Sequence, residues 1–562
     1  MNDIRRTMLW VVFSMSLIFL WDAWQKHNGQ PSMFSPPVPK PLAAATDNTD
    51  IPKAVTAPGM ALASKENAPV IATEKVEITT DLVKAVFDTR GGDIVRLELL
   101  HQRDPIDKTK NVVLFDFNKE RPYLAQTGLV SELQNQSFPN HSTAMALLPG
   151  VRRLEPDANE LSIQFESPVQ EGVKLTKTFT FNRGSYVVGV KHEISNVGQK
   201  AVKPQLYFQI VRHPLPPVGE SKLYFTFTGP VIYTTASKFI KMGFDAIAKQ
   251  KEGDKLPYEA RATDGWIGMV QHYYASAWML GLDSTDKTTR EFSTVKLPAS
   301  EMLNERYAVQ MVVPLGEMSG DQKRVVDARL FAGPQEEDKL SKLAPGLELV
   351  KDYGVLTLLA KPLFWLLTQL HNIIGNWGWA IVALVVLLKI AFYWLNASAY
   401  RSMAKMKAVA PRITDMRERL KDKPQEMQQE MMRIYREEKI NPLGGCLPIL
   451  AQMPFFIALY WVLLSSVEMR NAPWVGWITD LSAIDPYYIL PLLMTGTSLL
   501  QTWLNPTPPD PMQAKLMWIM PLVFSVMFFF FPAGLVLYWL TNNILSITQQ
   551  YLINKQLGVL GK

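Results

Sequence analysis

Five long apolar stretches in the second half of the chain constrain its fold more than any other feature of the sequence. Each approaches the roughly 20 residues that a helix needs to cross a hydrocarbon core about 30 Å thick. We therefore expect five membrane-spanning helices, in residues 373–395, 443–467, 487–504, 515–531 and 533–553. The mean hydropathy of all 562 residues is nevertheless +0.00, so a polar part must accompany this membrane part.

The first 27 residues predict one more membrane helix. Arg5 and Arg6 precede an apolar stretch from Met8 to Trp21, an order of charges that a cleaved signal peptide shares. No small-residue cleavage site follows directly, so we favour an uncleaved anchor in residues 1–27. With either interpretation, the chain that follows is exported.

The exported part consists of a predicted linker and a predicted β-domain. Residues 28–70 contain eight prolines and many Ala, Thr and Ser, a composition that cannot bury a core. In residues 71–345, β-branched and aromatic residues alternate with polar ones, which predicts strands. The clearest alternating segments are residues 76–78, 161–165, 176–181, 186–190 and 223–227. We expect one large all-β sandwich that lacks cysteine and is held by its core.

The distribution of basic residues sets the orientation of the chain in the membrane. Residues 396–441 contain eleven Lys or Arg, whereas the loop of residues 468–486 contains only Arg470. Positive residues remain on the cytoplasmic side. One anchor, an exported β-domain and five further spans therefore leave residues 396–441 and both termini in the cytoplasm, with residues 554–562 as a short cytoplasmic tail.

Residues 346–372 are apolar enough to be mistaken for another span. Lys361 and Pro362 lie within this segment, and His371 lies near its end. Counting it as a span would also place the eleven basic residues outside the cytoplasm. We expect an interfacial amphipathic helix here instead.

The basic segment, residues 396–441, predicts two amphipathic helices joined by a turn that contains Pro424, which together form a cytoplasmic helical hairpin. We expect Pro411 to kink or delay the first helix. Methionine side chains offer a soft apolar face to varied partners, so we expect four methionines of the hairpin to capture substrates. They are Met403, Met406, Met427 and Met431. The alternative is that these side chains only pack the hairpin against itself.

No motif in the sequence predicts catalysis or a bound cofactor. The chain has no Walker-type phosphate loop, no GxGxxG and no HExxH, and its single cysteine, Cys446, excludes an intrachain disulfide and a cysteine metal cluster. His192 and Glu193 point to opposite faces of a predicted strand, and we interpret them as surface residues. We expect no metal, no cofactor and no enzymatic activity.

The most informative single residue is Lys389, which lies inside an apolar span. A charge at the membrane centre costs about 2.5–3.5 kcal/mol on insertion scales. Lys389 lies six residues before Leu395, about 9 Å of helix, so its side chain could instead snorkel to the cytoplasmic interface. Polar residues in the other spans favour a hydrated groove open to the cytoplasm. The candidate groove residues are Lys389, Gln452, Gln501, Thr541, Asn542 and Ser546.

Several motifs of the membrane part resemble the YidC family of bacterial membrane-protein insertases. These motifs are Asn441-Pro442-Leu443-Gly444-Gly445-Cys446, Gln452-Met453-Pro454, Asp485-Pro486-Tyr487-Tyr488 and residues 531–539. The specific match covers about residues 354–557, and the anchor, linker and β-domain resemble the layout of the Gram-negative members. The resemblance implies a multi-domain membrane protein. Its α-helical membrane core has an N-terminal anchor plus five helices, with a periplasmic all-β supersandwich domain and a cytoplasmic helical hairpin.

The resemblance also implies the roles of individual residues. The five helices would surround a hydrophilic groove that is closed to the periplasm, with Lys389 where the family usually carries Arg. The substrate-contacting helices of the family imply a substrate slide made of Phe455, Phe456, Tyr538 and Trp539. The β-domain resembles the galactose-mutarotase supersandwich, which implies no sugar chemistry.

The implied function is insertion and folding of nascent inner-membrane proteins, alone or with the Sec translocon. The expected partners are nascent membrane proteins, the Sec translocon, membrane lipids and the ribosome, the last bound weakly because the tail is short. No DNA binding is expected. Two alternatives stay open: an envelope transporter or sugar-binding protein that acts through the β-domain, and a structural assembly partner without insertase activity.

Overall fold

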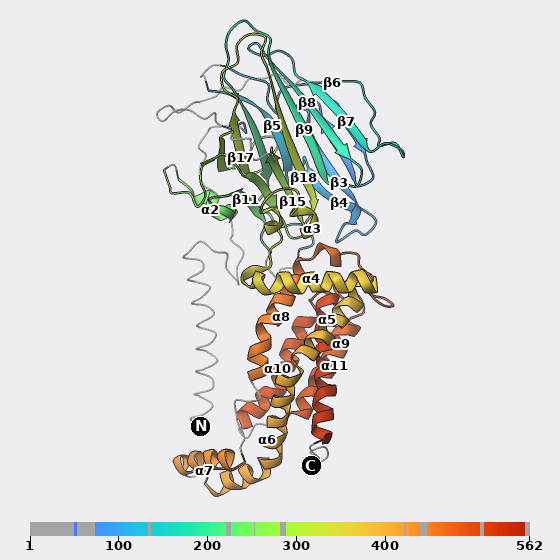
Figure 1. Cartoon of the computed structure of the whole chain (residues 1–562), viewed down its shortest axis with the longest axis vertical. Helices are drawn as coiled ribbons and strands as arrows, with labels where there is room; N and C mark the ends of the chain where they lie inside the picture. Colours follow the sequence, from blue (N-terminus) through green and yellow to red (C-terminus); the bar gives the residue numbers. More distant parts are fainter. Residues whose placement is uncertain are drawn as a thin grey trace. The chain divides into compact units, whose positions relative to one another are not determined.

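The computed structural model describes residues 50–52, 73–132, 136–220, 226–251, 253–281, 288–420, 423–438, 447–505 and 511–556. The chain divides into two compact units, one that ends at Lys351 and one that begins at Asp352 (Figure 1). We call them the β unit and the helical unit. The predicted anchor in residues 1–27, most of the predicted linker and residues 557–562 of the predicted tail lie outside the described residues.

The β unit is built from two antiparallel sheets, each with nine described strands. The first sheet has the order β1 (Lys75–Thr79), β2 (Val83–Asp88), β3 (Asp93–Arg103), β4 (Asn111–Asp116), β5 (Tyr123–Ser131), β10 (Pro204–Arg212), β17 (Arg306–Pro314), β16 (Arg290–Leu297) and β13 (Arg261–Ala262). The second has the order β12 (Lys238–Lys241), β11 (Gly229–Thr234), β14 (Trp266–Val270), β15 (Tyr274–Leu280), β18 (Lys323–Pro334), β9 (Val187–Asn196), β8 (Val173–Asn182), β7 (Glu160–Glu166) and β6 (Ala146–Leu147). Three short helices in the described part of this unit are α2 (Phe244–Lys249), α3 (Glu337–Leu340) and η1 (Leu347–Val350).

The hydrophobic core of the β unit lies between the two sheets. Phe208 of β10 contacts Trp278 of β15, with ring centroids 5.3 Å apart. Phe87 of β2 contacts Phe179 of β8 in the same way, at 4.9 Å. Each pair joins one sheet to the other, because successive strand residues point to opposite faces and only one face of each sheet meets its partner. The predicted all-β sandwich is confirmed.

A buried ion pair also joins the two sheets. Lys177 of β8 is 0% exposed, and its ammonium donates to the carboxylate of Asp93 at 2.7 Å. The same ammonium donates to the carbonyl oxygens of Gly91 at 2.7 Å and Thr127 at 2.8 Å. A buried charge needs this combination of a counter-ion and further hydrogen bonds, so removing either partner would leave an uncompensated charge.

Most of the strands expected from the alternation pattern are present. Residues 76–78, 161–165, 176–181 and 187–190 lie in β1, β7, β8 and β9. The prediction of a strand over residues 223–227 is wrong for residues 226–227, which belong to no strand. The next strand, β11, begins at Gly229. Residues 223–225 lie outside the described residues.

The expectation that His192 lies on the surface is wrong. His192 is fully buried, its Nε2 lies 3.0 Å from Thr127 Oγ1, and its ring lies 5.4 Å from that of Phe208. On β9 it occupies the same face as Val190 and Ile194, which are buried as well. The strand period therefore directs this histidine into the core, whereas Glu193 points to the other face.

The helical unit contains the predicted membrane part. Its helices are η2 (Gly354–Leu356), α4 (Thr357–Ile374), α5 (Trp377–Ala391), α6 (Tyr393–Arg419), α7 (Pro424–Glu437), α8 (Leu447–Ser465), η3 (Val467–Met469), α9 (Ile489–Leu504), α10 (Pro511–Phe528) and α11 (Ala533–Gln556). Helix α11 packs against α5, α6, α8 and α9, while α4 packs against α5 and α8. Most of α11 before Trp539 is buried, which makes it the central helix of this unit.

The stretch of residues 373–395 is not one straight helix. Helix α4 extends to Ile374 and ends at Gly375, whose positive φ of 75° terminates it. Helix α5 then ends at Ala391, and α6 continues from Tyr393 after a bend of 66°. Apolar residues continue through both breaks, so hydropathy alone does not mark them.

Among the described residues, no single helix is both long and apolar enough to span a membrane alone. The bent pair Trp377–Ala391 and Tyr393–Ser402 together has the required length and composition. Shorter apolar helices cover Ala451–Ser465, Ile489–Leu504 and Ala514–Phe528.

Helix α4 covers the segment predicted as an interfacial helix, although it begins at Thr357 rather than near residue 346. Pro362 lies within it and does not end it. One face of α4 buries Leu363 and Leu367 against the rest of the unit. Leu358 on another face is 88% exposed, so the helix offers apolar surface outward as well.

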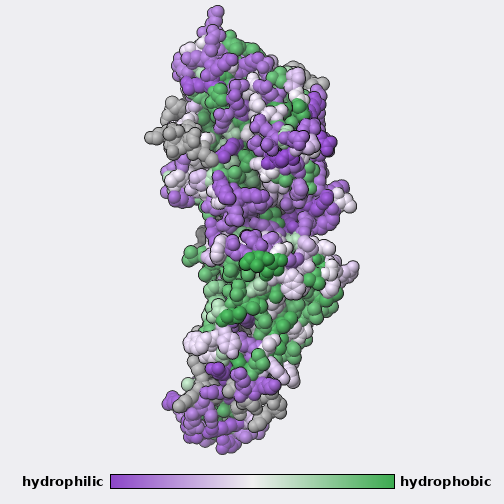
Figure 2. All heavy atoms as spheres, turned by 45° about the vertical axis from the view of Figure 1, so that its right-hand side comes forward, coloured by the Kyte–Doolittle hydropathy of each residue, from purple (hydrophilic) through white to green (hydrophobic). Residues whose placement is uncertain are grey.

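Much of the outer surface of the helical unit is apolar. Figure 2 shows hydrophobic residues over its helices and hydrophilic residues at the α6–α7 end. Helix α10 contributes most clearly, with Ile519, Val523 and Val526 all exposed. Contiguous exposed apolar surface of this kind marks contact with a membrane or a partner rather than with water.

Candidate functional site

The candidate site is centred on Lys389, near the end of α5. Its ammonium donates a hydrogen bond to Ser546 Oγ on α11, at 2.7 Å. Ser546 is buried and donates its own hydroxyl proton to the carbonyl oxygen of Asn542, also at 2.7 Å. The described hydrogen-bond partner of the ammonium is thus a neutral hydroxyl rather than a carboxylate, which leaves the positive charge free to attract an anion.

A second polar contact joins α6 to α8. Gln452 donates from Nε2 to Asn396 Oδ1 at 2.7 Å. Asn396 is buried, and its own Nδ2 has no hydrogen-bond partner among the described residues. A buried unsatisfied amide is costly, so this group is a natural place for a water or a polar substrate atom to bind. Asn396 lies in the segment predicted as the hairpin, and no pattern in the sequence assigns it to the groove.

The remaining predicted groove residues lie on α9 and α11. Asn542 lies one turn before Ser546 on α11, and both Asn542 and Thr541 are half-buried. Gln501 is half-buried on α9, the neighbour of α11. Lys389 and Ser546 are therefore joined directly, whereas no described hydrogen bond connects the side chains of Gln501 or Thr541 to Lys389.

Further amides on α11, outside the candidate set, bind neighbouring helices. Asn543 donates to Ser498 Oγ at 3.0 Å, and Gln550 donates to Asn505 Oδ1 at 3.0 Å. Gln549 donates to the carbonyl oxygen of Tyr393 at 3.3 Å. Amides on the second half of α11 thus contact α6 and α9, as expected where helices pack in a bilayer.

The four residues of the predicted slide are packed among helices. Phe455 contacts Phe392 with ring centroids 5.0 Å apart, and Phe456 contacts Tyr538 at 5.7 Å. Trp539 contacts Phe528 at 4.6 Å. Tyr538 is only 4% exposed, so it belongs to the core and does not form an accessible surface. Phe455, Phe456 and Trp539 are half-buried.

The hairpin of α6 and α7 has its own small core. Ile413, Met416 and Ile434 are buried there, and Met427 and Met431 pack against them. The alternative for these two methionines, packing of the hairpin against itself, is therefore the better description. Met406 is half-buried, and the Met403 side chain lies outside the described part. Helix α6 continues through Pro411, so this proline does not delay the helix, and the expected kink stays a prediction.

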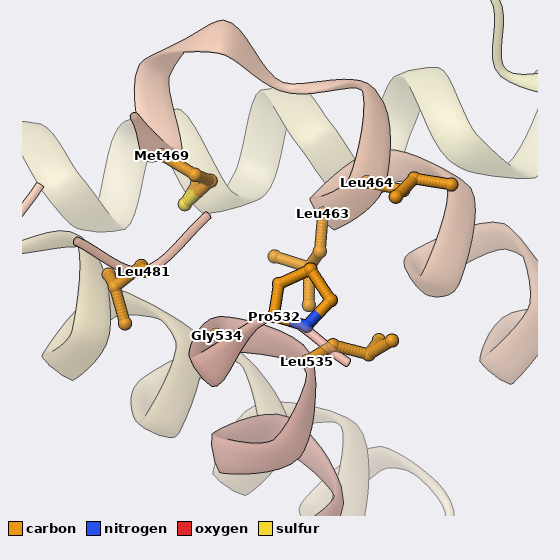
Figure 3. A pocket seen from close by; sticks show the side chains of 7 residues that line it. All are labelled: Leu463, Leu464, Met469, Leu481, Pro532, Gly534 and Leu535. Atoms are coloured by element: carbon orange, nitrogen blue, oxygen red, sulfur yellow. The ribbon is translucent and has the colours of Figure 1, made fainter. Parts of the chain in front are cut away.

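The opposite end of α11 is closed by backbone contacts. Ala533 N donates to the carbonyl oxygen of Ala483 at 2.7 Å, and Gly534 N donates to that of Leu481 at 2.9 Å. Figure 3 shows the small apolar pocket beside this contact, which has no room for a water molecule. It is lined by Leu463, Leu464, Met469, Leu481, Pro532, Gly534 and Leu535. Ser546 lies about 20 Å of helix beyond Ala533, so the polar groups are far from this dry end.

Asp485 stabilises the same closed end. It is buried, and its carboxylate accepts hydrogen bonds from Trp477 Nε1 at 2.9 Å and from the backbone N–H of Leu490 at 2.7 Å. The second bond satisfies a free N–H in the first turn of α9, where a negative charge also suits the helix dipole. Asp485 therefore belongs to the architecture of the site, although the sequence singled it out only as part of a motif.

Two family models match the chain, one after the other along the sequence. The model of the YidC periplasmic domain matches residues 75–366, and the model of the 60Kd inner membrane protein matches residues 369–558. Three proteins named membrane protein insertase YidC are similar over nearly the whole chain. The protein of Cupriavidus necator is 52% identical, with 99% of this chain and 98% of the relative covered. That of Ralstonia nicotianae is 49% identical with the same coverage. That of Janthinobacterium sp. is 47% identical, with 99% and 100% covered.

Two solved structures are similar to the chain at low identity. A crystal structure of an active YidC insertase with its first transmembrane domain resolved is 18% identical, covers 86% of this chain and 93% of its own, and has a TM-score of 0.38. A putative aldose 1-epimerase from Escherichia coli is 12% identical, covers 46% of this chain and 99% of its own, and has a TM-score of 0.28.

Proposed function

The chain belongs to the YidC family of membrane protein insertases, and from that premise we propose how its helical unit carries out insertion. It is an inner-membrane protein with a periplasmic domain. Its substrates are nascent membrane proteins, and insertion is not an enzymatic reaction. The relatives' names give no support to a transporter or a sugar-binding protein.

The proposed topology has six membrane spans with both termini in the cytoplasm. The eleven basic residues in residues 396–441 support it, because basic loops remain cytoplasmic. The β unit then lies in the periplasm, the α6–α7 hairpin in the cytoplasm, and α4 at the periplasmic interface. The dry end of α11 faces the periplasm in this arrangement, and the polar end faces the cytoplasm.

The observation that carries the proposed mechanism is the contact between Lys389 and Ser546, 2.7 Å long, between two helices of the membrane part. Among the described residues, the hydrogen-bond partner of this ammonium is a neutral hydroxyl, and in a low-dielectric surrounding such a cation attracts an acidic substrate tail strongly. Gln452 and Asn396 offer further hydrogen bonds close to the start of α6. Together these groups lower the cost of moving a polar tail part-way into the membrane.

The apolar part of the substrate then leaves along the outside of the helices. We assign this path to the neighbourhood of Phe455, Phe456 and Trp539, and leave out Tyr538 because it is buried. Transfer of apolar area into lipid supplies the driving force, roughly 25 cal/mol per Å². No covalent step and no nucleotide is required.

We further propose that the hairpin makes the first contact with substrates. Because Met427 and Met431 pack inside the hairpin, the exposed Met432 and the half-buried Met406 are better placed than those two. The Sec translocon, the ribosome and membrane lipids are proposed partners. Contact with the ribosome through the short tail is expected to be weak.

Photo-crosslinking tests the groove. A photoreactive residue at Asn542, one turn from Ser546, should capture arrested nascent membrane proteins. The matched control is the same residue at Val475, an exposed position in the loop before α9. Capture at Asn542 no greater than at Val475 would remove the groove from the mechanism.

A further inference from the structure

A second candidate site lies in the β unit, on the face of the first sheet that points away from the second sheet. On β10, Phe208 contacts Trp278 of the second sheet, so its neighbours Tyr207 and Gln209 point to the opposite face. The strand register places Gln126 of β5 and Gln310 of β17 directly beside Gln209. The outer face of these three strands therefore carries a row of amides at its centre.

Hydrogen bonds fix the central amide of this row. Gln310 donates to Gln209 Oε1 at 3.0 Å, and Gln209 donates from Nε2 to Gln126 Oε1 at 2.9 Å. The second proton of the same Nε2 is directed away from the row, to the backbone carbonyl oxygen of Asp50 at 3.1 Å. Gln209 is thus oriented to donate to an incoming backbone carbonyl.

Three residues from the predicted linker occupy this outer face. The carboxylate of Asp50 forms an ion pair with Arg306, at the start of β17. Ile51 packs against an apolar cluster of Val130, Tyr207 and Val312, and Pro52 is buried. The segment is therefore held by a charge, a backbone carbonyl and an apolar side chain.

Arg306 makes the site selective for a carboxylate. Its side chain is 2% exposed, and it also donates to the carbonyl oxygens of Pro298 at 2.9 Å and Asn304 at 3.3 Å. A guanidinium stays protonated in proteins, so it cannot escape burial by losing its charge. Burial of this charge is costly unless an anion pairs with it, and a carboxylate such as that of Asp50 supplies the anion.

The apolar part of the site is also preformed. Tyr207 lies across β5 because Gly128 has no side chain, since a Cβ there would come within 2.6 Å of the tyrosine hydroxyl. That hydroxyl is held by His141, whose Nδ1 lies 2.6 Å away. The ring is therefore fixed before any segment packs on it, which reduces the entropy lost on binding.

We propose that this outer face, which we call the peptide site (Val130, Tyr207, Gln209, Arg306 and Val312), binds a short peptide in which a carboxylate residue precedes a branched aliphatic residue. Asp50–Ile51–Pro52 is its displaceable occupant within the same chain. The chain bends at Ile51 on this face, and Pro52 limits the backbone conformations open to that residue. A tethered occupant competes at a high effective concentration, so a free peptide binds well only after the segment is released.

Binding of a labelled peptide to the purified full chain in detergent tests the proposal. The probe is a fluorescent peptide with the sequence of residues 46–56, and its binding is followed by anisotropy. A chain that carries Asp50→Asn and Ile51→Ser should bind the peptide at least tenfold more tightly than the unmodified chain, because its own segment no longer competes. The control peptide has Asn in place of the residue that corresponds to Asp50, and it should bind the opened chain at least tenfold more weakly.

Three outcomes would overturn the proposal. They are equal binding by both chains, no binding by an opened chain that retains its native tryptophan fluorescence, and equal binding of the two peptides. Asp50→Asn leaves the buried Arg306 without its carboxylate partner. If the double variant does not fold for this reason, the single variant Ile51→Ser takes its place in the binding assay. That variant keeps the ion pair and should show an intermediate gain in affinity.

Discussion

At the residue scale, the central feature is the ammonium of Lys389, which within the described part of the chain is hydrogen-bonded to a hydroxyl rather than to a carboxylate. Lys389 and Ser546 were both expected in the groove because polar residues are costly in apolar spans, and the structure joins them at 2.7 Å. The hydroxyl orients the ammonium but carries no charge of its own. Lys389 therefore keeps an electrostatic attraction that a salt bridge would cancel.

Substitution of Lys389 distinguishes two roles of this residue: attraction of an acidic substrate tail, and snorkelling of the lysine side chain to the cytoplasmic interface. We expect Lys389→Ala to slow the insertion of a substrate with an acidic tail about tenfold, because a hydrogen bond to a charged group is worth about 1.5–3 kcal/mol. Lys389→Arg should insert the same substrate normally, because it keeps the charge. The measurement is the initial rate of insertion into proteoliposomes. Ser546→Ala, which removes the hydroxyl but keeps the charge, should have a smaller effect, and equal rates for all variants would support snorkelling.

His192 predicts a pH dependence of the β unit. Burial and the nearby charge of Lys177 lower the pKa of His192 to about 3, against an ordinary value of 6.5. The folded state therefore keeps this histidine neutral, while the unfolded state gains a proton below about pH 6.5. The stability it contributes is complete above that pH and is lost as the pH falls towards 3, by about 2 kcal/mol at pH 5.

Hydrogen exchange of β5 and β9 in the full chain, measured between pH 7 and pH 5, tests this expectation. His192→Gln should reduce the loss of protection across that interval by about 2 kcal/mol, whatever its effect at pH 7. His141 and His213 remain in both chains, and burial lowers the pKa of each as well. An unchanged slope in the variant would show that His192 does not titrate as expected.

At the scale of the elements, the existence of helices and strands was predictable and their ends were not. Apolar length predicts that α8, α9, α10 and α11 are helices, but the 66° bend between α5 and α6 lies within continuous apolar sequence. The pair of Gln452 and Asn396 joins residues 56 positions apart, which no local pattern reveals. The burial of His192, in contrast, is predictable from the sequence, because this residue shares its strand face with Val190 and Ile194.

A glycine near the start of α5 predicts a packing requirement between elements. A Cβ on Gly378 would lie 2.2 Å from Cδ1 of Trp474, so Gly378→Ala forces the indole ring to move. We expect a loss of about 1–3 kcal/mol, the usual cost of overpacking, which exceeds the roughly 1 kcal/mol that alanine gains in a helix. The measurement is the Tm of the full chain in detergent. The matched control is Gly496→Ala on α9, which meets no atom within 4 Å and should leave Tm unchanged or slightly higher; an equal Tm for both variants would contradict the prediction.

At the scale of the whole molecule, the chain has two units with separate cores, and each unit carries one of the two candidate sites. The β unit has its core between two sheets, and the helical unit has a core centred on α11. The candidate groove residues all belong to the helical unit, whereas the peptide site belongs to the β unit. The apparent average of +0.00 in hydropathy is the sum of these two unlike parts.

Removal of the β unit tests this division. A chain without residues 73–350 should retain much of its insertion activity, because Lys389, Gln452 and Ser546 all lie beyond Lys351. Insertion of a small test substrate into liposomes is the measurement. Lys389→Ala in the shortened chain serves as the control and should lower this activity. Complete loss of activity on deletion, with the helical unit still folded, would place the essential site in the β unit.

The contact between Asp50 and Arg306 limits the length of chain between the proposed N-terminal anchor and the β unit. A fully extended chain reaches at most about 3.5 Å per residue, so about 46 residues between positions 27 and 73 could span roughly 160 Å. With Asp50 held by Arg306, only about 23 residues separate the anchor from the β unit, and the maximum falls to roughly 80 Å. Release of Asp50 and Ile51 from the peptide site would therefore double the maximum length of chain between the proposed anchor and the β unit, while the other end of that unit stays joined to the helical unit at Lys351.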